Sequence, residues 1–437
     1  MQKKTIINKN FFFLIILFFV SRYLINAYFQ IQINTPNYGY HLLDINLLKD
    51  DLFQSLLYLH SQPLLWNLFN GIIVKIMNAD ISSISIFFNI YHYFLTLIFI
   101  FLCIKILREF YIDKKVELFI FFFITLNPSI IFFENIFSYA HTTLIFFTLI
   151  SLNAIKLFKT NNSKYEIYIY INILILGLIW VLFQPLLLLI TFISIRLLRK
   201  ASKKIFFIFS LIFLFSLSPM IKNKYIFGVF TASSKSGQDF GTVFYDWRKY
   251  CGDPNTDLEY YSKLYDKEFK RSFDHQSLVG EKSNYNNIGI IVLGRDCFRS
   301  TIKRIFENPY IYFDGRVRAF LASHGKFAFD YVYPNPAGWQ KYYKYIYNAY
   351  ENSRVKFLRQ ILVFALMTYI YFTLFYFIFF KKDSNALKNG LLISCIPYIY
   401  LLIVGTFAAG TEQERILYTG FIVNILFFII LLKKNQY

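Results

Sequence analysis

The chain has 437 residues, of which 56% are hydrophobic, 21% aromatic and only 16% charged, and its formal net charge is +20. Soluble domains carry about 45–50% apolar and about 25% charged residues, so this composition argues against an ordinary soluble protein. The Lys and Arg residues flank apolar segments and do not form one patch, which argues against nucleic-acid binding.

The first apolar segment follows a basic amino terminus. Residues 1–10 contain three lysines, and the apolar run 11–20 comes directly after them. The run has the length of a signal peptide, but Arg22 and bulky residues stand where small residues would mark a cleavage site. We therefore expect an uncleaved first span over residues 11–29.

Apolar blocks of about membrane-crossing length recur along the rest of the chain. The expected spans cover residues 11–29, 82–107, 116–133, 139–157, 166–182, 184–198, 204–221, 356–380, 387–405 and 416–432. A shorter apolar segment, 63–78, is expected at the membrane interface. The pattern predicts an all-α polytopic membrane protein with about ten transmembrane helices.

The domain organisation follows from these spans. Residues 1–221 form a transmembrane module of seven spans with a first loop at 30–62. Residues 222–355 form a mostly helical hydrophilic domain between spans seven and eight, and residues 356–437 contain the last three spans. We call residues 222–355 the hydrophilic domain from here on.

The loops expected on one side of the membrane are all basic. They contain Lys105, Arg108, Lys114, Lys115, Lys156, Lys159, Lys164, Arg196, Arg199, Lys200, Lys203, Lys204, Lys381, Lys382, Lys388, Lys433 and Lys434. Short cytoplasmic loops are enriched in Lys and Arg. We therefore expect both termini in the cytoplasm, the hydrophilic domain outside it, and a multi-pass protein of a bacterial inner membrane.

Within the hydrophilic domain, residues 259–273 have helical spacing, and 286–312 reads as a helix ending before Pro309. The aromatic residues of 329–350 favour lipid anchoring over sugar stacking. Cys251 and Cys297 lie in this domain, and the sequence leaves open whether they pair.

Polar residues gather at the ends of spans on the side of the hydrophilic domain. The first loop, the turn between spans three and four, the exit of span seven and the loop before span ten supply Asp44, His60, Gln62, Glu134, Tyr139, Lys222, Glu412, Glu414 and Arg415. A single loop carboxylate is usually just solvated, and Arg415 could simply anchor a span. Their convergence favours a site, since a carboxylate can act as a general base and an arginine can bind phosphate.

Several of these segments resemble one family. An acidic first loop leads to an HSQPL turn at 60–64, NPSIIFFENIFSY follows at 127–139, SPMIKNKYIFGVF begins at 218, and EQER precedes the last span. This arrangement resembles the GT-C superfamily of integral-membrane glycosyltransferases, in particular the protein O-mannosyltransferase and aminoarabinose-transferase-like group. The resemblance covers about 11–240 and 400–432. The chain departs from the family in having Gln184-Pro185 where related chains often have Arg-Pro.

The resemblance implies a glycosyltransferase that moves a hexosyl or pentosyl group, with inversion, from a polyprenyl-phosphate donor to a lipid, glycan or protein acceptor. Asp44 matches the first-loop acid that acts as the catalytic base. The other polar residues named above would contact the donor phosphate or the sugar. The sequence has no CxxC or His/Cys cluster for zinc, and a role for a divalent metal stays open.

Two other functions remain as alternatives. A flippase or transporter of a lipid-linked glycan would have many spans, but we find no internal repeat and few ionisable residues at mid-membrane depth. A polysaccharide polymerase or ligase would also have many spans and one large outer loop, although that loop usually falls later in the chain.

Overall fold

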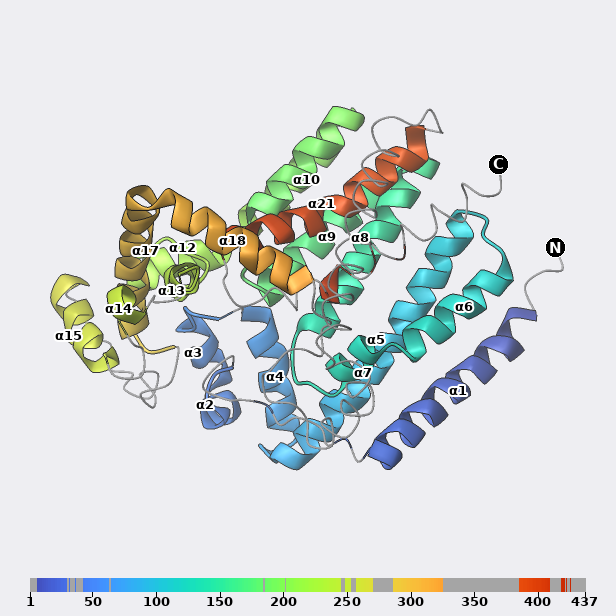
Figure 1. Ribbon diagram of the computed structural model, residues 1–437, viewed down its shortest axis with the longest axis horizontal. Coiled ribbons are helices and arrows are strands. Elements are labelled where there is room, and N and C mark those ends of the chain that lie inside the picture. The colour runs from blue at the N-terminus through green and yellow to red at the C-terminus, as the bar shows by residue number, and fades with distance from the viewer. Residues whose placement is uncertain are drawn as a thin grey trace.

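A computed structural model describes most of the chain, and each regular element in the described part is a helix (Figure 1). The described residues are 6–29, 31, 36, 42–62, 64–183, 185–200, 202–244, 248–252, 257–269, 286–324, 385–408, 418–420, 422 and 425. The all-helical prediction is confirmed for this part. The expected span 356–380, most of 416–432, the segment 329–350, and Glu412, Glu414 and Arg415 lie outside the described residues.

The first half of the chain forms the membrane bundle. Figure 1 shows α1 (Ile6–Phe29) at one edge of it, with α6 and α5 beside it. Three short helices follow in and after the first loop: α2 (Ile45–Asp50), α3 (Leu52–Leu57) and α4 (Leu64–Ile76). The remaining helices are α5 (Ile81–Glu109), α6 (Lys114–Thr125), α7 (Pro128–Glu134), α8 (Ala140–Thr160), α9 (Lys164–Ile179), α10 (Pro185–Leu198), α11 (Lys203–Ser216) and α12 (Ser218–Phe227).

The hydrophilic domain begins within α12, and its helices lie at the opposite end of the molecule from α1 (Figure 1). Its described helices are α13 (Ser236–Gly241), α14 (Arg248–Cys251), α15 (Leu258–Phe269), α17 (Gly289–Glu307) and α18 (Pro309–His324). The predicted helices at 259–273 and 286–312 correspond to α15 and α17, and α17 ends before Pro309 as expected. The chain then returns to the bundle as α21 (Asn385–Ala408).

Five helical segments in the described part are long and apolar enough to cross a membrane. They are Phe12–Phe29, Ile81–Glu109, Ala140–Thr160, Lys203–Phe227 and Lys388–Phe407. The bent pair α6 and α7 would make a sixth. The helices α9 and α10, expected as spans, have only 16 and 14 residues, which is below the length of about 20 that crosses the hydrocarbon core.

The expected span 116–133 is not one straight helix. The axis bends by 53° between α6 and α7. Pro128 has no N–H to continue the hydrogen-bond ladder, and Asn127 caps the new helix by accepting hydrogen bonds from the N–H groups of Ser129 (2.9 Å) and Ile130 (3.3 Å). The Asn-Pro pair therefore redirects the chain, and it delivers Glu134 to the buried centre of the bundle.

The core of the bundle is built around α8, which packs against α5, α9 and α21. Gly390 lies where α21 crosses α8, and a Cβ atom there would lie 2.9 Å from the Cα atom of Ile155. Glycine therefore allows a close approach of the two helices, as small residues do in membrane bundles.

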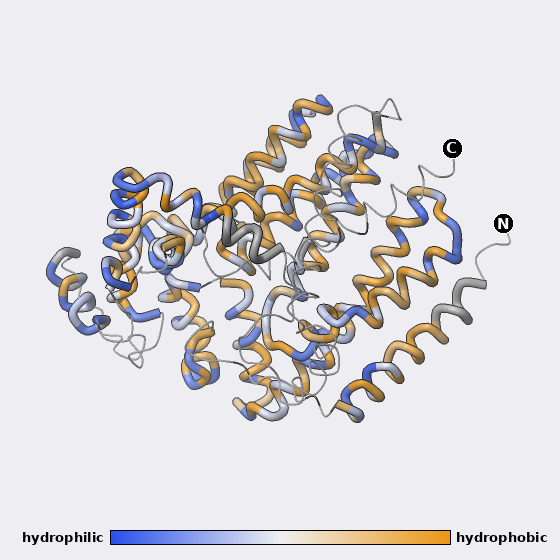
Figure 2. The backbone as a smooth tube through the Cα atoms, in the orientation of Figure 1, coloured by the Kyte–Doolittle hydropathy of each residue, from blue (hydrophilic) through white to orange (hydrophobic). Residues whose placement is uncertain are grey.

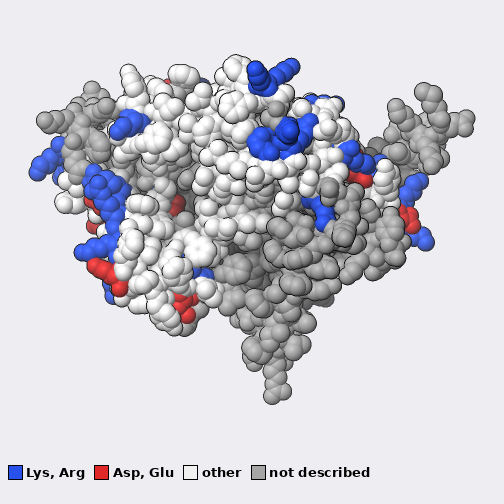
Figure 3. Space-filling model, turned by 90° about the horizontal axis from the view of Figure 1, so that it is seen from above, with Lys and Arg blue, Asp and Glu red and all other residues white. Residues whose placement is uncertain are grey.

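Hydropathy varies along the molecule. Apolar colours cover the long helices, and hydrophilic colours gather on α15, α17 and the turn between α5 and α6 (Figure 2). In the space-filling view, Lys and Arg residues form a group near the middle of the face and further groups toward its two ends, and most of the other described surface is uncharged (Figure 3). Long apolar helices with charges grouped at their ends fit a protein embedded in a bilayer.

Candidate functional site

A cavity of about 190 Å³ opens where α9, α10 and α12 meet the end of the first loop. Its apolar wall comes from α9 and α10 and includes Ile173, Leu178 and Leu188. Its polar wall comes from α12 and the first loop, and it consists of Gln62, Ser218, Lys222 and Asn223. The cavity therefore suits a ligand that has one apolar part and one polar part.

The start of α12 determines which lysine faces this cavity. Ser218 and Pro219 open the helix, and Lys222 follows on the same helical face, so all three line the cavity. Lys224 lies two residues on and is exposed, with its Nζ donating to the Gly228 carbonyl oxygen at 3.1 Å. The helix thus presents one lysine to the cavity and another to the outside.

Lys222 brings a charge to the cavity that no described acid balances. Its Nζ donates a hydrogen bond to the carbonyl oxygen of Leu59. Within the described residues, no carboxylate lies within 4.0 Å of this group. An ammonium group has three N–H donors. Lys222 therefore has donors and a positive charge to offer an anion.

His60, beside Leu59, fastens the first loop to the hydrophilic domain. Its ring Nδ1 lies 2.6 Å from the Ser234 hydroxyl, and its Nε2 lies 2.8 Å from the Asn286 carbonyl oxygen. Its backbone N–H donates to the Asn286 side chain, and its carbonyl oxygen accepts from the Ser234 N–H, both at 3.0 Å. We call these four contacts the His60 clasp. Sequence reasoning offered His60 as a substrate ligand, but the structure uses all its polar groups internally.

Burial favours the neutral imidazole in the clasp. A carbonyl oxygen only accepts hydrogen bonds, so Nε2 carries the hydrogen, and Nδ1 accepts from the hydroxyl of Ser234. Burial and the positive charge of Lys222 lower the pKa of His60 from 6.5 to about 3. His60 therefore stays uncharged at every physiological pH, and it holds Leu59 and Gln62 beside the cavity.

A second polar cluster lies inside the bundle and contains Glu134. The fully buried carboxylate of Glu134 pairs with Arg22 of α1, whose Nε lies 2.6 Å from one oxygen and whose NH2 donates to the other at 2.9 Å. Arg22 also donates to the Thr125 carbonyl oxygen at 2.6 Å. These contacts tie α1 to α6 and α7.

The cluster continues as a directed chain of hydrogen bonds. The Thr96 hydroxyl donates to Glu134 at 2.6 Å, so its oxygen accepts from Nε2 of His141 at 2.9 Å. Nδ1 of His141 then accepts from the hydroxyl of Tyr418 at 2.5 Å. We call Arg22, Glu134, Thr96, His141 and Tyr418 the Glu134 network. The hydrogen bonds from Tyr418 through His141 and Thr96 run toward the carboxylate, and Arg22 donates to it from the other side, so Glu134 organises the helices around it.

Asp44 lies apart from both groups. It caps α2, with one carboxylate oxygen accepting from the Asn46 N–H at 2.8 Å, and it is half-buried. The preceding residue, Leu43, donates its N–H to the side chain of Asn67 on α4 at 2.9 Å. The carboxylate is therefore held in place and still has a second oxygen to accept a proton. Its role as a base stays a prediction.

The structure brings together some of the predicted site residues and separates others. Lys222 and Gln62 share the cavity. Tyr139 is buried and packs against Trp66 and Trp180, with ring centroids 6.1 and 5.3 Å apart, so it belongs to the core. Glu134 belongs to its own network. The segment 412–415 lies outside the described residues, but Tyr418, a few residues further on, joins the Glu134 network.

Sequence reasoning missed the partner of Glu134. An arginine inside an apolar span is a signal in itself, since ionisable residues there pair with one another. Arg22 was used only as evidence against a cleavage site. Asn286 and Ser234 gave no comparable signal, because nothing in their spacing relates them to His60, more than 170 residues away.

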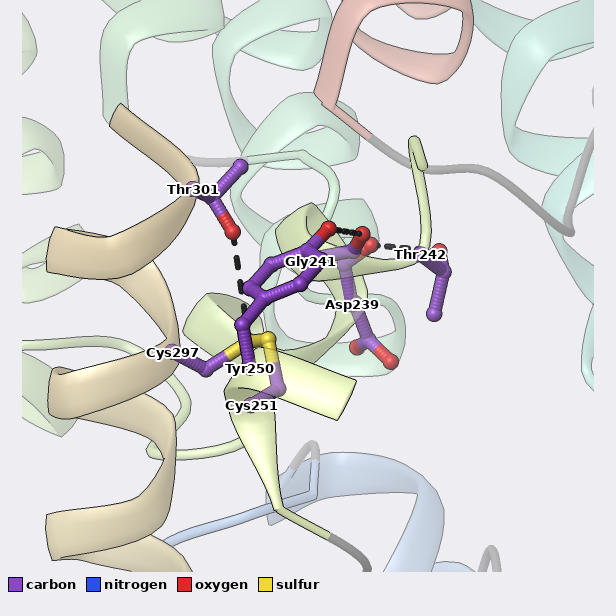
Figure 4. The surroundings of a disulfide bond; sticks show 7 residues. All are labelled: Asp239, Gly241, Thr242, Tyr250, Cys251, Cys297 and Thr301. Atoms are coloured by element: carbon purple, nitrogen blue, oxygen red, sulfur yellow. Dashed lines mark hydrogen bonds between the residues drawn. A yellow bond between two sulfur atoms is a disulfide. The ribbon is translucent and has the colours of Figure 1, made fainter. Parts of the chain in front are cut away.

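A disulfide joins Cys251 of α14 to Cys297 of α17, with the two Cα atoms 4.3 Å apart (Figure 4). Gly241, at the end of α13, packs directly on the bond, and a Cβ atom there would lie 2.6 Å from the sulfur of Cys251. The hydroxyl of Tyr250 donates to the Gly241 carbonyl oxygen at 3.2 Å. The disulfide thus fastens three helices of the hydrophilic domain at one point.

The described residues contain no group of three His, Cys, Asp or Glu side chains arranged to hold a metal ion. Compared with protein families, curated proteins and solved structures, the chain has no match. The case for a function therefore depends on the cavity, the two polar clusters and the sequence pattern.

Proposed function

We propose that this chain is an integral-membrane glycosyltransferase that moves a sugar from a polyprenyl-phosphate donor to a lipid, glycan or protein acceptor. The observation that supports this most is the apolar cavity with Lys222 on its polar side. The donor has the same two parts, an isoprenoid tail and a phosphate. An enzyme that uses it must bind the phosphate near the headgroup boundary while the tail stays among apolar groups.

The depth of Lys222 fits this requirement. Lys222 lies five residues before the end of the segment Lys203–Phe227, which is about 7.5 Å along a helix. That segment is longer than the hydrocarbon core of about 30 Å, so Lys222 lies near its boundary. The cavity of about 190 Å³ exceeds the cavity of about 150 Å³ that admits benzene. It has room for about one isoprene unit next to the phosphate.

The proposed reaction is a single displacement with inversion. The oxygen of an acceptor hydroxyl forms a bond to the anomeric carbon as the bond from that carbon to the phosphate oxygen breaks. The electron pair leaves with polyprenyl phosphate, and the hydroxyl proton passes to a carboxylate base. The resemblance offers Asp44 for this role, and Asp44 is not among the residues that line the cavity. Lys222 stabilises the negative charge that grows on the departing phosphate.

This function includes the orientation expected from sequence, with both termini in the cytoplasm and catalysis on the outer face of a bacterial inner membrane. The disulfide supports that orientation, because such bonds persist in oxidising compartments. Single cysteines introduced into the hydrophilic domain can be labelled in intact cells, which determines the side of the membrane on which this domain lies.

The test of the function is transfer itself. Purified protein in liposomes is incubated with radiolabelled polyprenyl-phosphate sugars and candidate acceptors, and the movement of label is followed. We expect Lys222→Gln to raise the KM for the donor roughly 10- to 100-fold, because a hydrogen bond to a charged group contributes about 1.5–3 kcal/mol. Lys224→Gln, on the same helix but outside the cavity, should behave like the parent. No transfer from any donor by the parent protein would refute the function.

A second candidate is proton-coupled transport of a lipid-linked glycan. One observation favours it: Arg22, Glu134, His92 and His141 form a buried ionisable cluster inside the bundle, and such clusters mark proton relays in transporters. The liposome assay separates the two functions. A transporter would move labelled lipid between leaflets without breaking the sugar–phosphate bond, and it would lose this activity in Glu134→Gln.

A further inference from the structure

The elbow between α17 and α18 carries an exposed apolar stripe. Phe306 is 82% exposed at the end of α17, and Tyr310 is 79% exposed at the start of α18. Ile311, Phe313 and Val317 follow on α18, each more than half exposed. The spacing of Tyr310, Phe313 and Val317 is i, i+3, i+7, which places them on one face of the helix. A hydrophilic domain surrounded by water would not be expected to present such a stripe.

The stripe continues a lipid-facing surface of the bundle. Along α21, Ile399, Ile403 and Phe407 recur every fourth residue and are 48%, 54% and 38% exposed, so they form one apolar face of a helix long enough to span the membrane. The ring of Phe313 packs edge-on against the ring of Phe407, with centroids 6.4 Å apart. The apolar surface therefore passes from the span onto α18 without interruption.

A hydrogen bond fixes the height of α18 relative to the membrane. The Tyr312 hydroxyl donates to the carbonyl oxygen of Phe407 at 2.6 Å. Phe407 ends the apolar segment Lys388–Phe407, so α18 lies at the level where that span leaves the hydrocarbon. Figure 1 shows α18 running across the direction of α1, α5 and α8. It therefore lies along the membrane surface and does not enter the bilayer end-on.

The charges on α17 are arranged to suit this position. Arg299 and Lys303 precede Phe306 by seven and three residues and lie on the same helical face, and both are exposed. Lys303 lies 3.7 Å from Glu307, one turn further on. Across 295–307 the described charges are Arg295, Arg299, Lys303 and Arg304 against Asp296 and Glu307. The excess is positive. Lys303 and Arg299 lie about 4.5 and 10.5 Å along the helix from Phe306, distances comparable to the headgroup layer.

We propose that the α17–α18 elbow is an interfacial anchor that binds the bilayer surface. The stripe of Phe306, Tyr310, Ile311, Phe313 and Val317 contacts acyl chains, and Arg299 and Lys303 contact the phosphates of lipid headgroups. The disulfide ties α14 to α17, so the anchor holds this part of the hydrophilic domain against the membrane. This inference does not depend on the enzymatic function.

Spin labels test the anchor without any activity assay. The background protein carries Cys103→Ala and Cys395→Ala and retains the disulfide. Single labels replace Ile311, Arg299 or Tyr260 in separate samples reconstituted into liposomes. Tyr260 is the matched control, because it is 64% exposed on α15 of the same domain. Collision rates with oxygen, which concentrates in the bilayer, and with a water-soluble nickel chelate report the depth of each label.

The anchor predicts an order of depths. The label at 311 should collide mainly with oxygen, the label at 260 mainly with nickel, and the label at 299 should fall between them. Equal nickel access at 311 and 260 would overturn the proposal. Dipolar broadening at 311 that disappears when labelled protein is diluted with unlabelled protein would also overturn it, because a second copy of the chain would then cover the stripe.

Discussion

Breaking the Arg22–Glu134 pair on one side should cost more stability than removing both charges. Arg22 makes three buried contacts, at 2.6 Å to the Thr125 carbonyl oxygen and at 2.6 and 2.9 Å to Glu134. Two of these contacts, to the Thr125 carbonyl oxygen and from NH2 to Glu134, are hydrogen bonds. At about 0.6 kcal/mol for each membrane side-chain hydrogen bond, their loss alone amounts to roughly 1 kcal/mol. Leaving the Glu134 carboxylate buried and unpaired raises the cost to about 3–5 kcal/mol. We therefore expect Arg22→Met to destabilise the protein by roughly 3–5 kcal/mol.

The double variant is the informative one. In Arg22→Met/Glu134→Gln no buried charge remains at either position, and the new glutamine amide can still accept from the Thr96 hydroxyl, so most of the lost stability should return. Equilibrium unfolding in mixed micelles would give the free energies of the parent, both single variants and the double variant. If the losses in unfolding free energy of the two single variants simply add in the double variant, Arg22 and Glu134 do not act as a pair that holds α1 to the bundle.

Three further predictions concern residues outside the spans. His60 takes up a proton near pH 6.5 in the unfolded chain but only near pH 3 in the folded protein. The free energy of unfolding should therefore fall by about 1.4 kcal/mol per pH unit as the pH drops below 6.5. In unfolding measurements His60→Gln should reduce this slope, and an unchanged slope would exclude the clasp as its cause. Cys251→Ser should destabilise the hydrophilic domain by about 4 kcal/mol, because it opens a disulfide loop of 46 residues. Limited proteolysis should then cleave the domain faster, and cleavage at the parental rate would contradict this. Asp44→Asn should insert normally but abolish transfer, whereas Asp50→Asn, further along the first loop, should retain it; near-normal transfer by Asp44→Asn would remove Asp44 as the base.

Much of the fold follows from the sequence. Apolar blocks of membrane-crossing length predicted the helices α1, α5, α8 and α21, because burial in lipid requires long uninterrupted apolar stretches. The end of α17 before Pro309 followed from the steric restriction that a proline places on the residue before it. The break at Asn127 was missed, because the flanking residues are so apolar that the block reads as one span.

The candidate site was harder to predict, because tertiary contacts decide it. Glu134 and Tyr139 were expected at the ends of spans in one site with the other loop residues, but the bend after Thr125 buries both inside the bundle. His60 was expected to contact substrate because it lies among the polar residues at that membrane face and in the HSQPL turn, and only the distant Ser234 and Asn286 show that it is structural. Lys222 alone among these residues both lines the cavity, as expected of a ligand contact, and carries a charge with no described carboxylate partner.

The most direct measurement of the central claim is where a donor lipid binds. A polyprenyl-phosphate analogue with a photoreactive group on the isoprene unit next to the phosphate is irradiated with the protein in liposomes, and the labelled peptides are sequenced. The account predicts labelling within 173–188, the apolar wall of the cavity, with strong reduction in Lys222→Gln and none in Lys224→Gln. Labelling elsewhere in the bundle, or labelling that is indifferent to Lys222, would contradict it.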